Sequence, residues 1–313
     1  MYTTAVVFQE PGSLQVRRLA LTRPGCSDVV AESLLSGIST GTEKMLFDGS
    51  MPPFPGMRYP LVPGYETVAR VVEAGPDSEH AIGDLVFVPG ANCFEDAAGL
   101  FGATAERIIL PGGRAIPIAD DLAEDAVLLS LAATAHHAVK RAHAPADLVI
   151  GHGVLGRLIA RVQIALGHKP PRVLETSADR RKGADGYEAV DAASESAGAP
   201  CACIIDASGN PAAIDGAIAR LARGGELVLA GFYGERVGFA FAPAFMREIS
   251  ISLASEFKPN DIHAVLALVA SGRLSLKGLI THSARPADAE AAYRTAFGDP
   301  ACLKMVIDWR TAG

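Results

Sequence analysis

A glycine-rich turn near the middle of the chain has the residue types and spacing that bind phosphate groups. Its residues are Gly151, His152, Gly153, Val154, Leu155 and Gly156. In such a Gly-x-Gly-x-x-Gly turn the first glycine permits a tight bend, the second lets the backbone approach a pyrophosphate, and the third lets helix and strand pack closely. The amides that open the following helix point at the phosphates, and the helix dipole favours their negative charge. The turn therefore predicts a dinucleotide-binding site.

The segments around this turn are typical of a strand, a helix, a second strand and a terminal acid. An apolar run at 148–150 precedes the turn, and apolar residues recur at helical spacing as far as Gly167. The second strand ends at Glu175, about 20 residues beyond the glycines, where a carboxylate can accept from both hydroxyls of an adenosine ribose. Because this carboxylate would repel a phosphate on that ribose, it favours NAD over NADP. Arg180 and Arg181 leave NADP open, since they could bind such a phosphate.

Length and composition limit the classes of protein to which the chain can belong. Its 313 residues suffice for two domains, and its hydrophobic fraction of 49% and charged fraction of 20% are ordinary for a globular protein. A net charge of -7 without a basic run argues against a nucleic-acid partner. No apolar stretch reaches the roughly 18 residues that span a bilayer, and residues 1–4 do not open a signal peptide, so we expect a cytoplasmic protein without a membrane span. The five scattered cysteines predict neither a disulfide framework nor a zinc knuckle.

The N-terminal third of the chain has the pattern of short strands separated by turns. We expect strands at 5–8, 14–16, 28–30, 32–35, 68–72 and 84–88. Their number and spacing predict a small β-barrel-like domain.

Two loops of this domain differ from ordinary scaffold. The loop at 37–43 concentrates hydroxyl groups and a carboxylate between glycines, and the loop at 51–64 contains five prolines. The larger apolar residues of the second loop are Phe54, Met57, Tyr59 and Leu61. Because proline fixes the backbone, this loop is either a wall for a large apolar substrate or a rigid connector.

From about residue 119 onward, strands alternate with helices. We expect helices at 122–141, 211–221, 259–270 and 286–297, and strands at 203–206, 227–230, 249–253 and 305–308. The alternation predicts an α/β fold with a doubly wound parallel sheet. The last strand can return to the first domain. We therefore expect one domain over 1–118 and 272–313 and a second over 119–271.

The order of these segments resembles that of the medium-chain dehydrogenases/reductases over nearly the whole chain. The closer similarity is to the bacteriochlorophyllide a dehydrogenases, the BchC family. The strings that carry it are GISTGTE at 37–43, MPPFPGMRYPLVPGYE at 51–66, GANCFEDAAGLFG at 90–102 and GHGVLGRL at 151–158. The resemblance implies a GroES-like β-barrel catalytic domain and a Rossmann domain. It also implies NAD-dependent oxidation of the hydroxyethyl group of a tetrapyrrole substrate to an acetyl group, and by analogy a homodimer.

The resemblance extends the predicted cofactor site beyond the glycine turn and Glu175. Further members of that site are Thr134, Arg180, Ser208 and Gly231. His152 is expected to contribute its backbone amide.

The residues depart from the zinc-dependent members of the superfamily at each metal ligand. The catalytic cysteine of those enzymes falls near Ser39 or Thr40, their ligating histidine falls at Tyr65, and their third ligand falls near Ser130. The four-cysteine structural zinc lobe is also missing, since Cys93 is the only cysteine between 27 and 200. Hydroxyl groups and one carboxylate are poor zinc ligands. We therefore predict neither a catalytic nor a structural zinc.

Without a metal, hydrogen bonding or general base catalysis must handle the hydroxyl proton of the substrate. Tyr65 could hydrogen-bond the alcohol oxygen, a desolvated Glu66 could accept its proton, and Thr40 and Thr42 could relay it. His136 is another candidate base, because its ordinary pKa lies near neutrality. Packing roles remain open for all of them: an ion pair with an arginine for Glu66, and core or surface packing for the histidine.

Two other functions share these sequence features. One is a zinc-free quinone or enoyl reductase that uses NADPH. The other is a nucleotide-binding scaffold or redox sensor that kept the fold and lost the chemistry. Cofactor preference and turnover of a tetrapyrrole alcohol distinguish the three.

Overall fold

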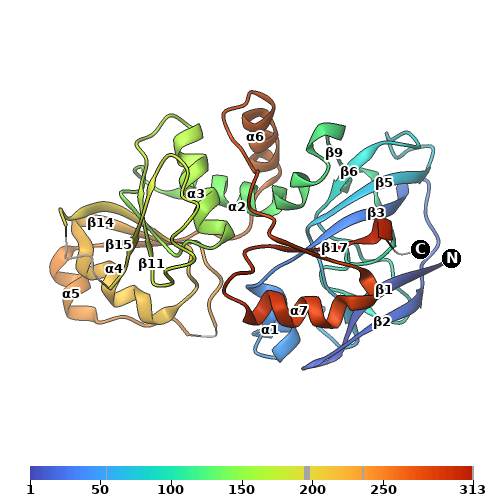
Figure 1. The fold of residues 1–313 in the computed structure, drawn as a ribbon, viewed down its shortest axis with the longest axis horizontal. Coiled ribbons are helices and arrows are strands. Elements are labelled where there is room, and N and C mark those ends of the chain that lie inside the picture. Colours follow the sequence, from blue (N-terminus) through green and yellow to red (C-terminus); the bar gives the residue numbers. More distant parts are fainter. Residues whose placement is uncertain (54, 194–197, 235, 312–313) are drawn as a thin grey trace. The chain divides into compact units, whose positions relative to one another are not determined.

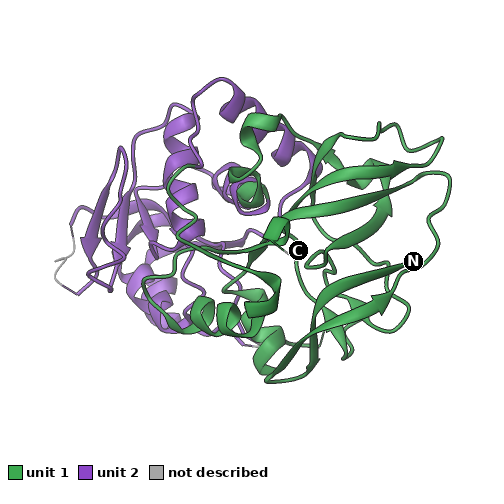
Figure 2. Cartoon of the chain, turned by 45° about the vertical axis from the view of Figure 1, so that its right-hand side comes forward, with its two compact units in different colours: residues 1–129, 277–313 green, residues 130–276 purple. Residues whose placement is uncertain are grey.

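The computed structural model describes residues 1–313 apart from 54, 194–197, 235 and 312–313. The chain divides into two units: unit 1 comprises 1–129 and 277–313, and unit 2 comprises 130–276 (Figure 2). The sequence pattern indicated boundaries at 118/119 and 271/272. The first boundary lies later because a 3-10 turn over Asp125–Leu128 is buried and packs against strands of unit 1.

Unit 1 contains two sheets (Figure 1). The smaller sheet has the order β2–β1–β4–β7, formed by Ser13–Ala20, Tyr2–Glu10, Leu61–Val62 and Ala98–Gly99. The larger has the order β16–β17–β3–β5–β6–β9, formed by His282–Ala284, Met305–Asp308, Asp28–Ile38, Thr67–Ala74, Leu85–Val88 and Ile116–Pro117. β8, over Arg107–Pro111, pairs with β3. A core of small aliphatic side chains joins both sheets, including Val7 of β1, Val30 of β3 and Ile108 of β8.

The last strand of unit 1 returns to the first part of the chain. β17 pairs antiparallel with β3, with Met305 opposite Ile38 and Ile307 opposite Ser36. This pairing places residues near the C-terminus beside the loop at 37–43. The helices of unit 1 are α1 (Thr42–Asp48) and α7 (Ala289–Gly298), and its 3-10 turns are η1 (Gly112–Arg114), η2 (Asp120–Leu122), η3 (Asp125–Leu128), η5 (Pro286–Asp288) and η6 (Trp309–Thr311).

Unit 2 is a six-stranded parallel sheet with helices between its strands. The strands are β10 (Leu148–Ile150), β11 (Arg172–Glu175), β12 (Glu188–Asp191), β13 (Cys201–Asp206), β14 (Leu221–Leu229) and β15 (Ser250–Leu253). Their order, β12–β11–β10–β13–β14–β15, is the doubly wound order 3-2-1-4-5-6. The predicted α/β class, with a barrel-like domain and a parallel sheet, is confirmed.

The helices of unit 2 are α2 (Leu129–Arg141), α3 (Val154–Ala165), α4 (Ile214–Arg220), α5 (Phe241–Arg247) and α6 (Pro259–Ala270), with a 3-10 turn η4 (Pro211–Ala213). α3 buries Leu158, Ile159 and Val162 and is followed by Gly167 with φ +84°, a left-handed residue typical of a helix end. None of the helices in the described ranges is both long and apolar enough to cross a membrane.

Several predicted elements are wrong in their bounds; the strands expected at 28–30 and 32–35, for example, form the single strand β3. The helix expected over 122–141 begins only at Leu129, because the preceding residues form the 3-10 turns η2 and η3. The strand expected at 227–230 begins earlier, at Leu221, and pairs irregularly with β13 around the predicted glycine turn.

Candidate functional site

The glycine turn of unit 2 follows β10, at the point where the strand order of the sheet reverses. Gly151 has φ +93°, and a side chain there would approach Ser208 to 3.1 Å. A Cβ at Gly156 would lie 1.8 Å from the carbonyl oxygen of Gly151, so only glycine lets α3 pack on the turn. A Cβ at Gly153, by contrast, would meet nothing within 4 Å. The turn is therefore open at the one glycine that a pyrophosphate must approach.

Glu175 ends β11 and holds its carboxylate beside this turn. Its Oε2 accepts from the backbone N–H of His152 at 3.0 Å, and its Oε1 accepts from the N–H of Ser177 at 2.8 Å. Partial burial raises the pKa of this carboxyl, but the two backbone donors outweigh it and the net pKa lies below the ordinary value. An ionised acceptor at this position can accept from the hydroxyls of a ribose.

The two arginines after Glu175 take different roles. The guanidinium of Arg181 donates to the carbonyl oxygens of Glu175 at 3.2 Å and Thr176 at 2.9 Å, and lies 3.3 Å from a carboxylate oxygen of Asp191. Arg181 thus holds the local backbone. The charge of Arg180 acts on Glu175 and helps to lower its pKa.

His152 contributes more than the backbone amide that the sequence predicted. Its ring is fully buried, with Nδ1 2.6 Å from the carbonyl oxygen of Arg180 and Nε2 2.8 Å from the hydroxyl of Tyr187. Burial lowers the pKa of the imidazole to about 4. The ring is therefore neutral near pH 7 and serves as a packed hydrogen-bonding group.

The remaining predicted cofactor residues lie on unit 2 as follows. Ser208 follows β13 and donates to Asp206 through its backbone N–H at 2.7 Å and its hydroxyl at 2.8 Å. Gly231 follows β14, where a Cβ would lie 2.4 Å from the backbone nitrogen of Gly209. Both residues share the carboxyl-end edge of the sheet with the glycine turn, where ligands of such sheets bind. Thr134 lies half-buried on α2.

In unit 1 three hydroxyl groups meet in one cluster. The phenol of Tyr65 donates to Ser39 Oγ at 2.5 Å and lies 3.0 Å from Thr42 Oγ1, and Ser39 and Thr42 are 3.4 Å apart. The ring of Phe101 packs edge-on against Tyr65, with centroids 5.3 Å apart. Thr40 is exposed, so the cluster uses Ser39 in its place. We call these three residues, Ser39, Thr42 and Tyr65, the hydroxyl cluster.

The hydroxyl cluster is a set of neutral groups. Burial and the charge of Glu66 raise the pKa of Tyr65 above its ordinary value, although the side chains of Ser39 and Thr42 oppose the rise. Tyr65 is therefore a protonated phenol throughout the physiological range. It can donate a hydrogen bond and pass a proton along the cluster.

Glu66 has a buried ion-pair partner. Its Oε2 pairs with the ammonium of Lys304, which also donates to the carbonyl oxygen of Ile38 at 3.1 Å. A Cβ at Gly37 would lie 2.4 Å from this carboxylate oxygen, so the absence of a side chain at Gly37 leaves room for the ion pair. The arrangement favours the ion-pair alternative for Glu66, with a lysine where the sequence analysis expected an arginine.

A second buried acid, Glu43, was not among the predicted site residues. It lies in the first turn of α1, fully buried, and accepts from the hydroxyl of Tyr293 at 2.9 Å. Its Oε1 has no hydrogen-bond partner among the described residues. Burial and the charge of Glu66 raise its pKa to about 8, so the carboxyl is largely protonated at neutral pH. The available signal was a carboxylate between hydroxyls and glycines at 37–43.

His136 is held by a carboxylate of unit 2. Its Nδ1 lies 2.7 Å from Asp261, and Nδ1 of His137 lies 3.2 Å from the other oxygen of the same carboxylate. Asp261 also accepts from the N–H of Lys258 at 2.8 Å, which caps α6. This arrangement ties α2 to α6 and agrees with the packing role that the sequence left open for His136.

The described residues do not offer a zinc site. No three histidine, cysteine, aspartate or glutamate side chains gather in a metal-binding group within the described ranges. The counterparts of the metal ligands are the hydroxyl-bearing residues Ser39 or Thr40, Tyr65 and Ser130, and zinc prefers thiolate, imidazole and carboxylate. The donor set therefore does not fit this metal.

The proline-rich loop packs as scaffold where it is described. Met57 and Tyr59 contact the apolar core of unit 1, Leu61 is fully buried in β4, and the hydroxyl of Tyr59 bonds the carbonyl oxygen of Leu46. Phe54, also predicted to form a substrate wall, lies outside the described residues. This agrees with the rigid-connector alternative for these three side chains.

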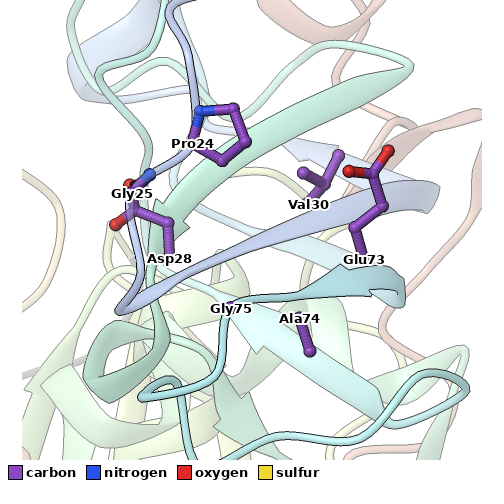
Figure 3. A pocket seen from close by; sticks show the side chains of 7 residues that line it. All are labelled: Pro24, Gly25, Asp28, Val30, Glu73, Ala74 and Gly75. Carbon is purple, nitrogen blue, oxygen red and sulfur yellow. Dashed lines mark hydrogen bonds between the residues drawn. The ribbon is translucent and has the colours of Figure 1, made fainter.

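A small pocket of unit 1 lies away from the hydroxyl cluster, between the turn before β3 and the end of β5 (Figure 3). Its volume is about 120 Å³. The carboxylate of Asp28 in its wall accepts a hydrogen bond from the backbone N–H of Gly25 at 2.7 Å. Ligand pockets typically measure about 300 to 1,000 Å³, so this one is too small for a nucleotide or a pigment.

Comparison with known proteins agrees with both halves of this description. A profile of the alcohol dehydrogenase GroES-like domain matches residues 28–120. The chain is 52% identical over 316 residues to the 2-desacetyl-2-hydroxyethyl bacteriochlorophyllide A dehydrogenase of Cereibacter sphaeroides, with 99% of each chain covered. It is 49% identical over 314 residues to the protein of the same name from Rhodobacter capsulatus, with 100% of each covered.

A solved structure shares the fold. An alcohol dehydrogenase from Escherichia coli CFT073 in complex with NADH matches with a TM-score of 0.83 at 21% identity, covering 98% of this chain and 99% of that one. The fold, the GroES-like match and the full-length identity to two relatives agree with each other. The chain therefore belongs to the bacteriochlorophyllide a dehydrogenase (BchC) family of the medium-chain dehydrogenases/reductases.

Proposed function

We propose that this protein oxidises the hydroxyethyl side chain of a bacteriochlorophyllide to an acetyl group, with NAD as hydride acceptor and without zinc. The observation that carries the substrate assignment is the full-length identity of about half to two relatives named for this reaction. The glycine turn, Glu175 and the hydroxyl cluster support the remaining parts.

The choice of NAD rests on Glu175. The carboxylate is ionised and fixed by two backbone donors, so a phosphate on the adjacent ribose would meet a negative charge. The open space at Gly153 and the close packing at Gly156 fit a pyrophosphate over the start of α3. When bound, the dinucleotide supplies the hydride acceptor.

The hydroxyl cluster handles the hydroxyl proton of the substrate. The substrate hydroxyl donates to the phenol oxygen of Tyr65, which is half-buried and protonated and donates its own hydrogen to Ser39. As the carbinol hydrogen leaves as hydride, the hydroxyl proton passes along Tyr65, Ser39 and Thr42. Thr42 is half-buried at the start of α1 beside the exposed Gly41, which gives the proton a way to solvent. General acid–base steps of this kind contribute about 10²- to 10⁴-fold.

The substrate itself reduces what the protein must supply. Its carbinol is conjugated to an electron-rich macrocycle, which spreads the positive charge that develops as hydride departs. A set of neutral hydroxyls can then take the place of the Lewis acid that a metal would supply. The donor set at 39, 42 and 65 supports this zinc-free account.

We also propose a homodimer formed through the outer edge of β15. β15 is the last strand of its sheet, and Leu253 on it is 69% exposed. Beside it, Phe241, Phe245 and Met246 of α5 are exposed and line an apolar groove of about 560 Å³. An open strand edge flanked by apolar side chains can pair with the same edge of a second copy across a two-fold axis. This pairing would cover both the strand edge and the apolar side chains. Sedimentation should show a dimer that Leu253→Asp splits, while Ile82→Asp, at an apolar residue 73% exposed in unit 1, leaves it intact.

Mass spectrometry of the pigment product tests the reaction. Purified protein incubated with hydroxyethyl bacteriochlorophyllide and NAD should yield a pigment lacking two hydrogen atoms, one lost as hydride and one as a proton. Reduction of a quinone or enone by NADPH, with no change in the pigment, would instead identify a reductase. Tight NAD binding without turnover of either substrate would identify a scaffold or sensor.

A further inference from the structure

One arginine of α3 donates to four backbone carbonyls beside the glycine turn. Arg157 follows the third glycine and is 6% exposed. Its Nε donates to the carbonyl oxygen of His152 at 3.0 Å, and its two terminal nitrogens donate to those of Gly183 at 3.0 Å, Arg180 at 2.8 Å and Lys182 at 2.7 Å. A single guanidinium thus joins the turn to the segment that follows β11.

His152 makes a second link between the same two segments. A carbonyl oxygen can only accept, so Nδ1, at 2.6 Å from the carbonyl of Arg180, must carry the ring proton. Nε2 of the neutral ring then accepts from the hydroxyl of Tyr187 at 2.8 Å. The imidazole is held at both nitrogens, and the backbone carbonyl oxygen of His152 accepts from Arg157.

These links converge on Glu175. The segment they hold, at 180–183, comes shortly after Ser177, whose hydroxyl accepts from the N–H of Arg180 at 3.4 Å. The N–H of Ser177 binds one carboxylate oxygen, and the turn that the links hold presents the N–H of His152 to the other. Neither N–H belongs to the regular hydrogen bonds of β11. The position of the carboxylate therefore depends on how the segment over 176–183 is folded.

The cost of this arrangement argues for a role beyond packing. Burying a guanidinium opposes its charge, and burial is the first cause that lowers the pKa of Arg157. Four carbonyl dipoles satisfy its donors, but they do not neutralise it. A buried cation one residue beyond the turn also adds positive potential where α3 begins, which suits an anionic ligand.

We propose that Arg157, assisted by His152, is the positioning residue that fixes the segment over 180–183 and so holds Glu175 in place to select NAD over NADP. This inference rests on the proposed binding of a dinucleotide at the glycine turn. Arg157 acts through the backbone and through Glu175, so it governs cofactor affinity and preference and leaves the hydride step unchanged.

The test measures NADH and NADPH binding, together with kcat and KM for both cofactors, in Arg157→Met, Arg157→Lys, Glu175→Ala and the double variant. Arg157→Met should raise KM for NAD on the order of tenfold, lower the NAD-to-NADP preference and change kcat little. Arg157→Lys should not restore the KM for NAD or the cofactor preference, because one ammonium cannot reach four carbonyls in fixed directions. Lys140→Met, which removes an exposed charge at the end of α2, is the matched control.

The double variant provides the decisive comparison. If Arg157 acts through Glu175, the two losses of preference should not add, and the double variant should resemble Glu175→Ala alone. Hydrogen exchange should also be faster over 176–187 in Arg157→Met. Should that variant fail to fold, Tyr187→Phe, which removes only the donor to His152, is measured for the same preference and exchange.

The outcomes separate this inference from the function on which it rests. If the wild-type protein binds neither NADH nor NADPH, the proposed function fails. If it binds NADH and a folded Arg157→Met keeps the same preference and exchange, or if the losses add fully, Arg157 has no positioning role.

Discussion

Lys304 and Glu66, 238 residues apart in the chain, form an ion pair inside unit 1, with side chains 2% and 0% exposed. The pair forms because β17 returns beside β3 and brings Lys304 under the loop that carries Ser39. Removing one partner of a buried pair leaves an uncompensated charge. Glu66 therefore has a structural role: its ion pair with Lys304 stabilises the fold next to the hydroxyl cluster.

Replacing either partner should destabilise the protein strongly. We expect Lys304→Met or Glu66→Gln to lower the free energy of unfolding by about 3–5 kcal/mol, and the double variant to lose less than the sum. Urea denaturation checks this. Arg294→Met, which breaks an exposed 2.8 Å pair with Glu290 on α7, should cost under about 1 kcal/mol. Equal effects in the two pairs would contradict the structural role of Glu66.

The phenol of Tyr65 should matter for turnover. Tyr65→Phe removes the hydroxyl that accepts from the substrate alcohol and donates to Ser39, so we expect kcat to fall about tenfold or more with little change in stability. Ser39→Ala and Thr42→Val should lower kcat in the same direction. Tyr2→Phe, at an exposed tyrosine of β1, serves as control. Unchanged kcat in Tyr65→Phe would remove the cluster from the mechanism.

Glu43 should make stability depend on pH. Its pKa is about 8 in the folded protein and 4.5 as an ordinary glutamate, so the folded state binds the proton more tightly. Stability from this group is complete below pH about 4.5 and is lost as the pH rises toward about 8, by an amount on the order of a few kcal/mol. Glu43→Gln cannot titrate, so its unfolding free energy relative to wild type should increase over this range. A constant difference between pH 5 and 8 would show that Glu43 is ionised in the fold.

Glu175 should decide the cofactor. Glu175→Ala removes the acceptor for the ribose hydroxyls and the charge that repels a phosphate, so we expect weaker NAD binding and a shift toward NADP. Steady-state kinetics with each cofactor measures the ratio of kcat/KM. The same ratio in variant and wild type would place the selecting group elsewhere.

Local patterns predicted the elements around the glycine turn well. Leu148 to Glu175 is one contiguous strand–turn–helix–strand unit whose parts follow from neighbours in sequence, and α6 was predicted with its observed bounds. The ring of His152 was missed because its partners, Arg180 and Tyr187, lie in an irregular segment that no periodicity describes.

The hydroxyl cluster and the acids near it in unit 1 depend on contacts between distant segments. Tyr65 meets Ser39 only because β5 pairs with β3, and Lys304 reaches Glu66 only because β17 joins the same sheet. The sequence indicated that the last strand could return to the first domain, but the spacing of the residues gives neither the partner nor the register of these strands. Glu43 was missed for the same reason, since its burial depends on Tyr293 of α7.

The most direct test is the oxidation of hydroxyethyl bacteriochlorophyllide by chelator-treated protein, followed in one spectrophotometer trace for pigment and NADH. The account predicts that the long-wavelength band of the pigment shifts as the acetyl group forms, that NADH appears in equal amount, and that added zinc changes neither rate. A loss of activity that only zinc restores, or no NAD-dependent shift at all, would contradict it.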